Sequence, residues 1–265
     1  MGSATREALA SSRTALAAHA DSADLATGES LFDAGRVIGN SSQLLAAIGD
    51  ASAEEKAKTA LVKAVFAPTL TPVALELLQS AAAARWSSQQ DLLAGIEELA
   101  LRVTAASAPA DVSIDAELFT FGAAVSSDAD LELALTSKLT APAAKVSLVD
   151  ALLKGKASAQ TLVIVRHLVQ QPRGRRIGEL LGDAAAIVAD QADTMIATVI
   201  SATRLTSTQL DRLAKTLSAR YGRNLTINQV IDPSVVGGLK VQIGDDVIDG
   251  SIATRLKDLR LQLAG

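Results

Sequence analysis

The sequence predicts a mainly α-helical protein, with a duplicated helical bundle followed by a small α+β module of βαββα type. Alanine and leucine supply most of an apolar content of 49% in 265 residues, and both lose little conformational entropy in a helix. One long helical stretch recurs at a constant spacing. Near Met195 the pattern changes to short, β-branched and alternating segments, which are typical of strands.

The recurring stretch indicates an internal duplication. "LFDAGRVIGNSSQLLAAI" begins at Leu31, and "LFTFGAAVSSDADLELAL" begins at Leu118, which lies 87 positions later. The same offset places Gly35 on Gly122 and continues without a gap. Since two repeats are too few for an open stacked array, we expect bundles. The expected domains are a leading helix with the first repeat (1–110), the second repeat (111–194) and the C-terminal module (195–265).

Residues that favour helix starts recur within the repeats. Ser52 and Glu55 have the spacing of a capping box. Thr71 precedes Pro72 and is expected to cap a helix in which proline is the first residue. Thr140 is expected to play a similar part in the second repeat.

The C-terminal module is expected to contain strands and two helices. A capping box of Thr206 and Gln209 precedes one helix, and Gly222 follows it at a position that favours a left-handed conformation. The expected elements are strand 195–201, helix 207–221, strands 225–231, 239–243 and 247–248, and a last helix capped by Ser251.

Composition argues against several functional classes. A net charge of −4 and an aromatic content of 2% are unlike those of a nucleic-acid-binding protein. Without cysteine, the chain has neither disulfides nor a thiolate metal site. We find no apolar signal sequence and no stretch typical of a membrane span. We therefore expect a soluble, cytosolic chain that reaches a membrane only through partners.

Candidate catalytic and ligand-binding groups are sparse. The only histidines are His19 and His167, and we interpret His167 as a partly exposed helix residue, with a Ser/His/Asp triad as the disfavoured alternative. Gly237 and Gly238 lack the flanking residues of a phosphate-binding loop, so a turn or bulge with positive φ is favoured.

The acidic cluster near the C-terminus has the wrong spacing for a calcium loop. Asp245 and Asp246 are expected in a solvated hairpin turn, and Asp249 is expected to accept a structural hydrogen bond. We therefore predict no catalytic residue, no cofactor site and no metal site in this chain.

A basic cluster follows Pro172 and contains Arg173, Arg175 and Arg176. Cations at a helix start oppose the helix dipole. We expect solvated side chains, and a packing or partner-binding role is the alternative. Trp86 occupies the position equivalent to Arg173 in the first repeat and is expected to be a partly buried anchor.

The C-terminal sequence resembles a known family. "LTSTQLDRLAKTLSARYGRNLTINQVIDPSVVGGLKVQIGDDVIDGSIATRL" is similar to the end of the delta subunit of F-type ATP synthases, the oligomycin-sensitivity-conferring protein family. Upstream, "PRGRRIGELLGDAAAIVADQ" resembles the last helices of that family's bundle. The usual member has one bundle, so this chain resembles an enlarged form. The motif positions are Asp232, Pro233, Gly237, Gly238, Gly244, Asp249, Gly250, Ser251 and Leu256.

The resemblance implies a non-catalytic stator subunit at the cytoplasmic face of the cell membrane, present in one copy per ATP synthase. Family members bind N-terminal helices of the alpha subunits through the bundle and the C-terminal end of the b subunit through the C-terminal module. Which repeat binds the head is left open. An adaptor of another assembly and an enzyme using the α+β module are the alternatives. Candidate partner contacts are Arg173, Arg176, Leu259 and Leu263.

Overall fold

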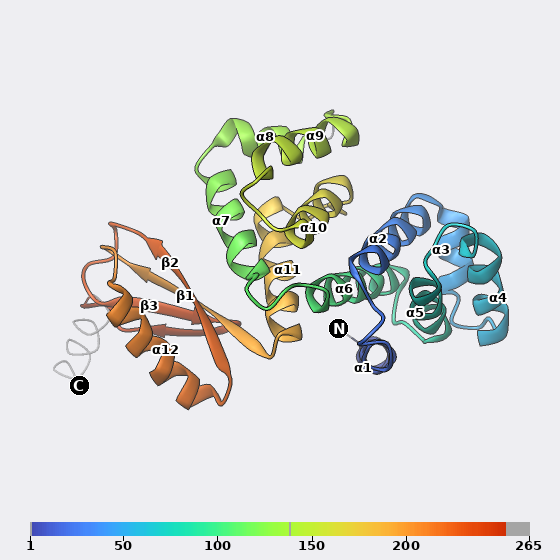
Figure 1. Ribbon diagram of the computed structural model, residues 1–265, viewed down its shortest axis with the longest axis horizontal. Helices are drawn as coiled ribbons and strands as arrows, with labels where there is room; N and C mark the ends of the chain where they lie inside the picture. The colour runs from blue at the N-terminus through green and yellow to red at the C-terminus, as the bar shows by residue number, and fades with distance from the viewer. Residues whose placement is uncertain (1, 138, 253–265) are drawn as a thin grey trace, which may run out of the picture. The chain divides into compact units, whose positions relative to one another are not determined.

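The computed structural model describes residues 2–137 and 139–252, and the chain forms two compact units, Met1–Val188 and Ala189–Gly265 (Figure 1). The first unit is helical, and the second contains a sheet with one described helix. This confirms the predicted mainly α fold with a C-terminal α+β module. Among the described residues, no helix is long and apolar enough to cross a membrane.

The helices that precede the sheet follow one another with short connections. They are α1 (Ser3–Ala18), α2 (Leu25–Asn40), α3 (Ser42–Gly49), α4 (Glu55–Phe66), α5 (Pro72–Ala83), α6 (Gln89–Ala106), α7 (Ile114–Ser126), α8 (Ala129–Thr136), α9 (Pro142–Leu153), α10 (Ala159–Gln170) and α11 (Ile177–Gln191).

Helix boundaries repeat with the offset found in the sequence. Subtracting 87 from the bounds of α8, α9 and α10 returns the bounds of α3, α4 and α5. The same shift places α11 within α6, and adding 87 to the bounds of α1 also falls within α6. Helix α6 is therefore both the last helix of the first repeat (α1–α6) and the first helix of the second repeat (α6–α11). The predicted boundaries at residues 110 and 194 stay predictions.

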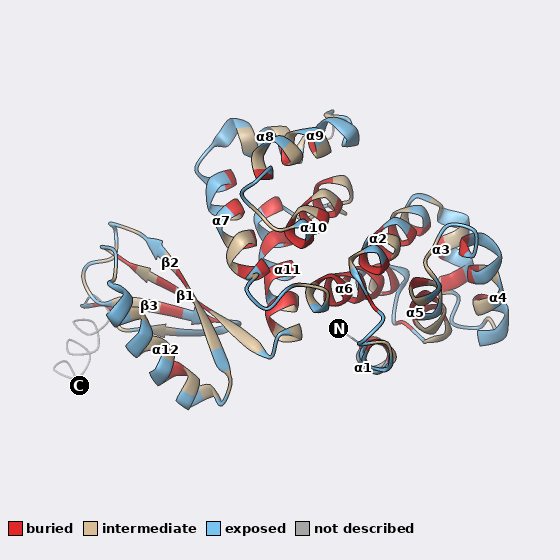
Figure 2. Cartoon of the chain, viewed as in Figure 1, coloured by how far each residue is buried: buried red, intermediate tan, exposed pale blue. Residues whose placement is uncertain are grey.

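Helix α6 is buried on two faces, as its colouring indicates (Figure 2). It packs against α1, α2 and α5 of the first repeat and against α10 of the second. One consequence is that the two repeats share a core instead of meeting through a linker. The fully buried side chains of α6 include Leu92, Ile96, Leu99 and Leu101.

Two of the predicted helix caps are wrong. The backbone N–H and the hydroxyl of Ser52 both donate to Asp50, at 2.8 and 2.7 Å, so Ser52 closes a turn before α4 instead of capping it. Thr140 lies one residue too early, because Ala141 is the N-cap of α9. Thr71 caps α5 as predicted, and its hydroxyl accepts from the N–H of Ala74.

The second unit is built on a mixed sheet in the strand order β2-β1-β3-β4. Strand β1 pairs in parallel with β2, antiparallel with β3, and β3 pairs antiparallel with β4. The elements are β1 (Thr194–Ser201), α12 (Ser207–Tyr221), β2 (Asn224–Ile231), β3 (Leu239–Ile243) and β4 (Asp246–Asp249). The predicted capping box of Thr206 and Gln209 is confirmed, and so is the left-handed Gly222, with φ of 70°.

One face of this sheet packs against α12, as hydrophobic alternation along the strands predicts. The buried centre comprises Ala197, Val199, Leu217, Val241 and Ile243, and Leu213, Leu225 and Ile227 pack around it. A small core of this size depends on accurate strand connections.

The double glycine lets the β2–β3 connection lie against the segment after β4. Gly237 and Gly238 have φ of 65° and 78°. The N–H of Ile252 donates to the carbonyl of Gly237 at 3.2 Å. A Cβ on Gly238 would lie 2.4 Å from the carbonyl oxygen of Gly250, so only glycine fits there.

Asp232 and Asp249, two aspartates of the family motif, stabilise turns by accepting hydrogen bonds. The side chain of Asp249 accepts from the N–H of Ser251 at 2.9 Å, which confirms its expected role as a structural acceptor. Asp232 accepts from both the hydroxyl and the N–H of Ser234, and these bonds lower the pKa of Asp232. Leu256, Leu259 and Leu263, with the body of the expected last helix, lie outside the described residues.

Gly238→Ala is predicted to destabilise the sheet more than Gly222→Ala does. Both glycines are left-handed, which costs an alanine about 1–2 kcal/mol, but an added Cβ at Gly222 meets no atom within 4 Å. Hydrogen–deuterium exchange of β1–β4 in the full chain should therefore be faster in the Gly238→Ala variant. Equal exchange in the two variants would mean that the close approach to Gly250 is unimportant.

Candidate functional site: a buried polar junction between the helical repeats

His167 lies in the interior, where the sequence prediction of a partly exposed histidine is wrong. Its residue is 3% exposed. Helical spacing explains the difference, because His167 follows Ile164 by three positions and precedes Leu168, and both are buried. The apolar stripe of α10 therefore carries the ring into the helical unit.

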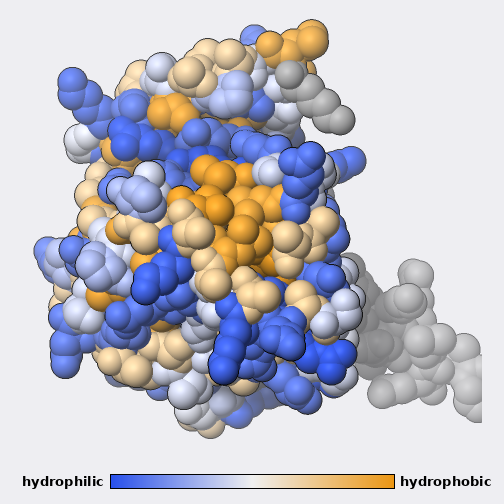
Figure 3. All heavy atoms as spheres, turned by 90° about the vertical axis from the view of Figure 1, so that its right-hand side faces the viewer, coloured by the Kyte–Doolittle hydropathy of each residue, from blue (hydrophilic) through white to orange (hydrophobic). Residues whose placement is uncertain are grey.

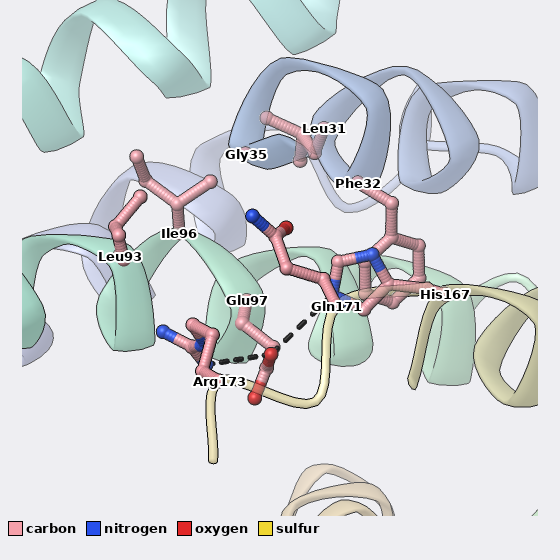
Figure 4. A pocket seen from close by; sticks show the side chains of 9 residues that line it. All are labelled: Leu31, Phe32, Gly35, Leu93, Ile96, Glu97, His167, Gln171 and Arg173. Atoms are coloured by element: carbon pink, nitrogen blue, oxygen red, sulfur yellow. Dashed lines mark hydrogen bonds and ion pairs between the residues drawn. The ribbon is translucent and has the colours of Figure 1, made fainter. Parts of the chain in front are cut away.

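Glu97 is the centre of a buried ionic cluster (Figure 4). Its residue is 8% exposed, on the face of α6 directed at the second repeat. One carboxylate oxygen lies 3.3 Å from Nε2 of His167 and 2.6 Å from Nη2 of Arg173. The other lies 2.8 Å from Nη2 of Arg175. Buried charges are tolerated when they are paired and hydrogen-bonded in this way.

Residues of α2 complete the cluster from the first repeat. The ring of Phe32 stacks on that of His167, with centroids 4.2 Å apart and an interplanar angle of 26°. Nη1 of Arg36 lies 3.4 Å from Nδ1 of His167. A neutral ring that carries its hydrogen on Nε2 satisfies both contacts, because Nδ1 then accepts from Arg36 while Nε2 donates to Glu97. We call Phe32, Arg36, Glu97, His167, Arg173 and Arg175 the junction.

The pKa values of the junction follow from burial and from the surplus of cations. Burial by itself raises the pKa of Glu97, but the hydrogen bond from His167 and the charges of Arg173 and Arg175 outweigh it and lower that pKa to about 2. Burial lowers the pKa of His167; Glu97 opposes this effect, and Arg36 and Arg173 reinforce it. Near neutral pH the carboxylate is therefore charged and the imidazole neutral.

Small residues on α2 bring the helices together around this cluster. A Cβ on Gly28 would lie 2.3 Å from the hydroxyl of Thr104, and one on Gly39 would lie 2.3 Å from Nε2 of Gln171. The cavity beside Glu97 and His167 is only about 10 Å³, close to the space of a single water molecule. This enclosed cavity has no room for a substrate, and the polar groups beside it bind one another. A more open hollow of about 270 Å³ lies beside Phe32, Arg36 and His167.

The basic cluster is divided between the interior and the surface. Arg173 and Arg175 form ion pairs with Glu97. These two side chains therefore have the packing role that the sequence predicts as the alternative to solvated side chains. Arg176 is exposed. Partner contacts by Arg173 and Arg176 stay predictions.

Trp86, the first-repeat equivalent of Arg173, is also an anchor. Its Nε1–H donates to the carbonyl of Ala81 at 2.8 Å, and it packs over Gly95, where an added Cβ would meet its ring at 2.0 Å. Sequence reasoning missed Glu97. Two features of the sequence could have indicated it. Glu97 lies within the apolar run from Leu92 to Leu101, and the chain also contains a basic cluster that could supply its counter-charge.

Apolar side chains also remain accessible on the outer helices of each repeat. Figure 3 shows hydrophobic side chains gathered near the middle of the face over α3 and α4, with charged side chains around them. Val65 on α4 is 41% exposed, and Leu44 and Leu61 are partly exposed. The equivalent residues of the second repeat, Leu131, Leu148 and Leu152, are partly exposed too. Such patches are typical of protein-binding surfaces.

The second unit has a groove of about 320 Å³ beside α12. It is open to solvent, and its lining combines leucines with polar side chains. Its lining residues are Leu205, Gln209, Arg212, Leu213, Thr216 and Leu239.

Glu97→Gln is predicted to lower the free energy of unfolding by about 3 kcal/mol, because it leaves the partly buried Arg173 without its counter-charge and removes one of the two carboxylates that pair with Arg175. Glu7→Gln, on the exposed surface of α1, is the matched control and should change stability by no more than about 0.5 kcal/mol. Urea unfolding of the full chain followed by helical circular dichroism measures both. Similar values for the two variants would contradict the structural importance of the junction.

The helical unit is predicted to lose stability on acidification. Both pKa values are lower in the folded chain than in the unfolded chain, so the unfolded chain binds more protons. The contribution of His167 is complete above its ordinary pKa of 6.5 and declines below it, whereas that of Glu97 declines from 4.5 towards about 2.

Unfolding free energies measured between about pH 8 and about pH 5 should therefore decline less in a His167→Gln variant than in the unaltered chain. His19 is present in both proteins, so the difference isolates His167. A parallel decline would exclude His167 as the source.

Comparisons with known proteins agree with the architecture. A sequence model of the family "ATP synthase delta (OSCP) subunit" matches residues 99–263, which begin inside α6 and cover α7–α11 and the sheet of the C-terminal module. Helices α1–α5 precede the matched residues.

Relatives extend over the whole chain. An ATP synthase subunit delta from Leifsonia xyli subsp. xyli is 56% identical over 265 residues, covering 100% of both chains. One from Kineococcus radiotolerans is 40% identical, covering 90% of this chain and 88% of its own. One from Streptomyces coelicolor is 36% identical, covering 100% of this chain and 98% of its own. The chain belongs to the ATP synthase delta (OSCP) subunit family.

Proposed function

We propose that this protein is a peripheral-stalk subunit of the F-type proton-translocating ATP synthase. In this role it connects the catalytic head to the b-subunit stalk and resists the torque of the rotor. The observation that carries the proposal is the match of residues 99–263 to the delta (OSCP) family, together with 56% identity to a delta subunit over the full length. The role requires no catalytic residue, cofactor or metal from this chain.

The proposed partners are the N-terminal helices of the alpha subunits and the C-terminal end of the b subunit. The helical repeats bind the head, and the C-terminal module, with Leu259 and Leu263, binds the stalk. The protein is present once per complex, at the cytoplasmic face of the cell membrane, and is held there by its partners. Apolar patches on the outer helices and the groove beside α12 support binding of amphipathic helices.

A stator must transmit force without yielding between its two attachment points. A flexible linker between the repeats would transmit force poorly, because a disordered chain extends easily under load. The shared helix α6 removes such a linker from the helical unit. The paired charges of the junction hold the repeats in one arrangement, and this supports a mechanical role.

Separating the two compact units should separate the two attachments. The fragment Ala189–Gly265 keeps the strands β1–β4 and the ion pair of Arg223 with Asp190, at 3.2 Å. We expect it to retain binding to the purified b subunit and to lose binding to the catalytic head. The complementary fragment, residues 2–188, should show the reverse.

Affinity pull-downs with both fragments and the full chain measure this, after circular dichroism has verified that each fragment folds. If the C-terminal fragment captured head and stalk equally, the proposed division between the units would be wrong. If the full chain captured neither, the stalk function itself would be wrong.

A further inference from the structure

His167 ties α10 to two other helices through both of its ring nitrogens. Nε2 donates to Glu97 of α6 at 3.3 Å, and Nδ1 accepts from Nη1 of Arg36 of α2 at 3.4 Å. The ring of Phe32 stacks on the imidazole from the α2 side (Figure 4). Because His167 is almost fully buried, water does not replace either of these polar contacts. The attachment of α10 to α2 therefore depends on the state of one ring.

Only one of the two polar contacts tolerates a proton on the ring. The imidazolium ion carries hydrogens on both nitrogens, and a guanidinium group has donors but no acceptor. The contact with Glu97 survives protonation, because Nε2 donates in either state. The contact with Arg36 does not survive, since two donors on two positive groups then face each other across 3.4 Å. Protonation of His167 thus acts selectively on the contact between α10 and α2.

Charges near the ring add to this repulsion. Glu97 is the carboxylate that contacts the ring, and Arg173 and Arg175, from the connection after α10, already pair with it. A proton on His167 therefore adds a positive charge to a cluster whose central carboxylate is already shared. The lowered pKa of His167, for which burial is the main cause, agrees with this arrangement.

Carboxylates on the other helices that pack against α10 or line the hollow are engaged elsewhere or exposed. Helices α7 and α9 also pack against α10. Three of these carboxylates bind another group: Asp33 of α2 binds Arg36, Asp150 of α9 binds Arg166, and Glu117 of α7 binds Ser158. Glu29 of α2 lines the hollow beside His167 but is exposed to water. These groups do not supply a buried counter-charge for the imidazolium ion.

Arg36 has room to move away from the ring. Its side chain is 26% exposed, and it lines the open hollow of about 270 Å³ beside His167. Its carboxylate partner, Asp33, is exposed. The guanidinium group can therefore turn into water without losing its ion pair. Arg173 lies instead beside the enclosed cavity of about 10 Å³, which offers no such path.

The pair occurs only where the two repeats meet. The residue equivalent to His167 in the first repeat is Ser80, and the residue equivalent to Arg36 in the second repeat is Ala123. Neither substitute titrates or carries a charge. A single bundle of this type therefore folds without the pair, and the pair belongs to the contact between bundles.

We propose that His167 and Arg36 form a proton-sensitive latch between α10 and α2, which is closed near neutral pH and released when the imidazole is protonated. On release, α10 loosens from α2, while the shared helix α6 still joins the two repeats. One consequence rests on the proposed stator function: acid makes the helical unit a less stiff connection. The latch itself is a property of the isolated chain.

An NMR titration of the histidine rings in the full-length chain tests the contact with Arg36. Arg36→Gln removes the like charge and leaves an amide that either donates to Nδ1 or accepts from it, so we expect the pKa of His167 to rise. Arg166→Gln is the matched control, because Arg166 lines the same hollow but pairs with Asp150, and it should shift this pKa much less. A His19→Gln variant identifies the second histidine signal. Equal shifts in the two arginine variants, or none in Arg36→Gln, would overturn the proposal.

Hydrogen exchange tests whether protonation releases α10. Below the ordinary pKa of 6.5 for His167, protection factors of α10 amides, corrected for intrinsic exchange, should fall by up to about tenfold per pH unit, the limit for one proton. Amides of α4 and α5 should keep their protection over the same range. In Arg36→Gln, and in His167→Gln as a second variant, the fall in α10 should disappear.

Two outcomes of the exchange measurement would refute the latch. One is unchanged protection of α10 in acid. The other is an equal loss of protection in α4 and α5, which would indicate general unfolding and not a local release. Neither outcome bears on the stator function, which the fragment pull-downs test separately, so failure of one proposal is distinguishable from failure of the other.

Discussion

Burial of one helix by two bundles is the constraint on which the helical unit depends. Helix α6 presents apolar side chains in almost every direction, and it completes the core of the first repeat while beginning the second. The cost is that a carboxylate, Glu97, is removed from water, and three cationic or hydrogen-bonding groups offset that cost.

Equivalent positions in the two repeats anchor the chain through different interactions. Trp86 anchors the chain after α5 by packing over Gly95, whereas its counterpart Arg173 anchors the chain after α10 by pairing with Glu97. The apolar anchor faces a single bundle. The ionic anchor lies where two bundles meet, and its geometric specificity fits a position that has to fix one arrangement of the repeats.

Periodicity and local chemistry predicted much of this fold. The offset of 87 residues matched the helix boundaries, and the β-branched segments, the Thr206 cap and the left-handed Gly222 were identified correctly. Contacts distant in sequence were not accessible in this way. His167 and Glu97 are 70 positions apart, and nothing local indicates that α2, α6 and α10 meet. Ser52 does not cap α4 because the helix begins at Glu55 with Glu54 as its N-cap, and Ser52 instead donates to Asp50 in the preceding turn.

The central claim is that the repeats form one mechanical body through α6. Native-state hydrogen exchange of the full chain at increasing denaturant measures this most directly. Amides of α2, α6 and α10 should exchange through a single opening with one free energy and one denaturant dependence. An opening of α1–α5 at lower free energy, with α6–α11 still protected, would show two independent bundles and contradict the claim.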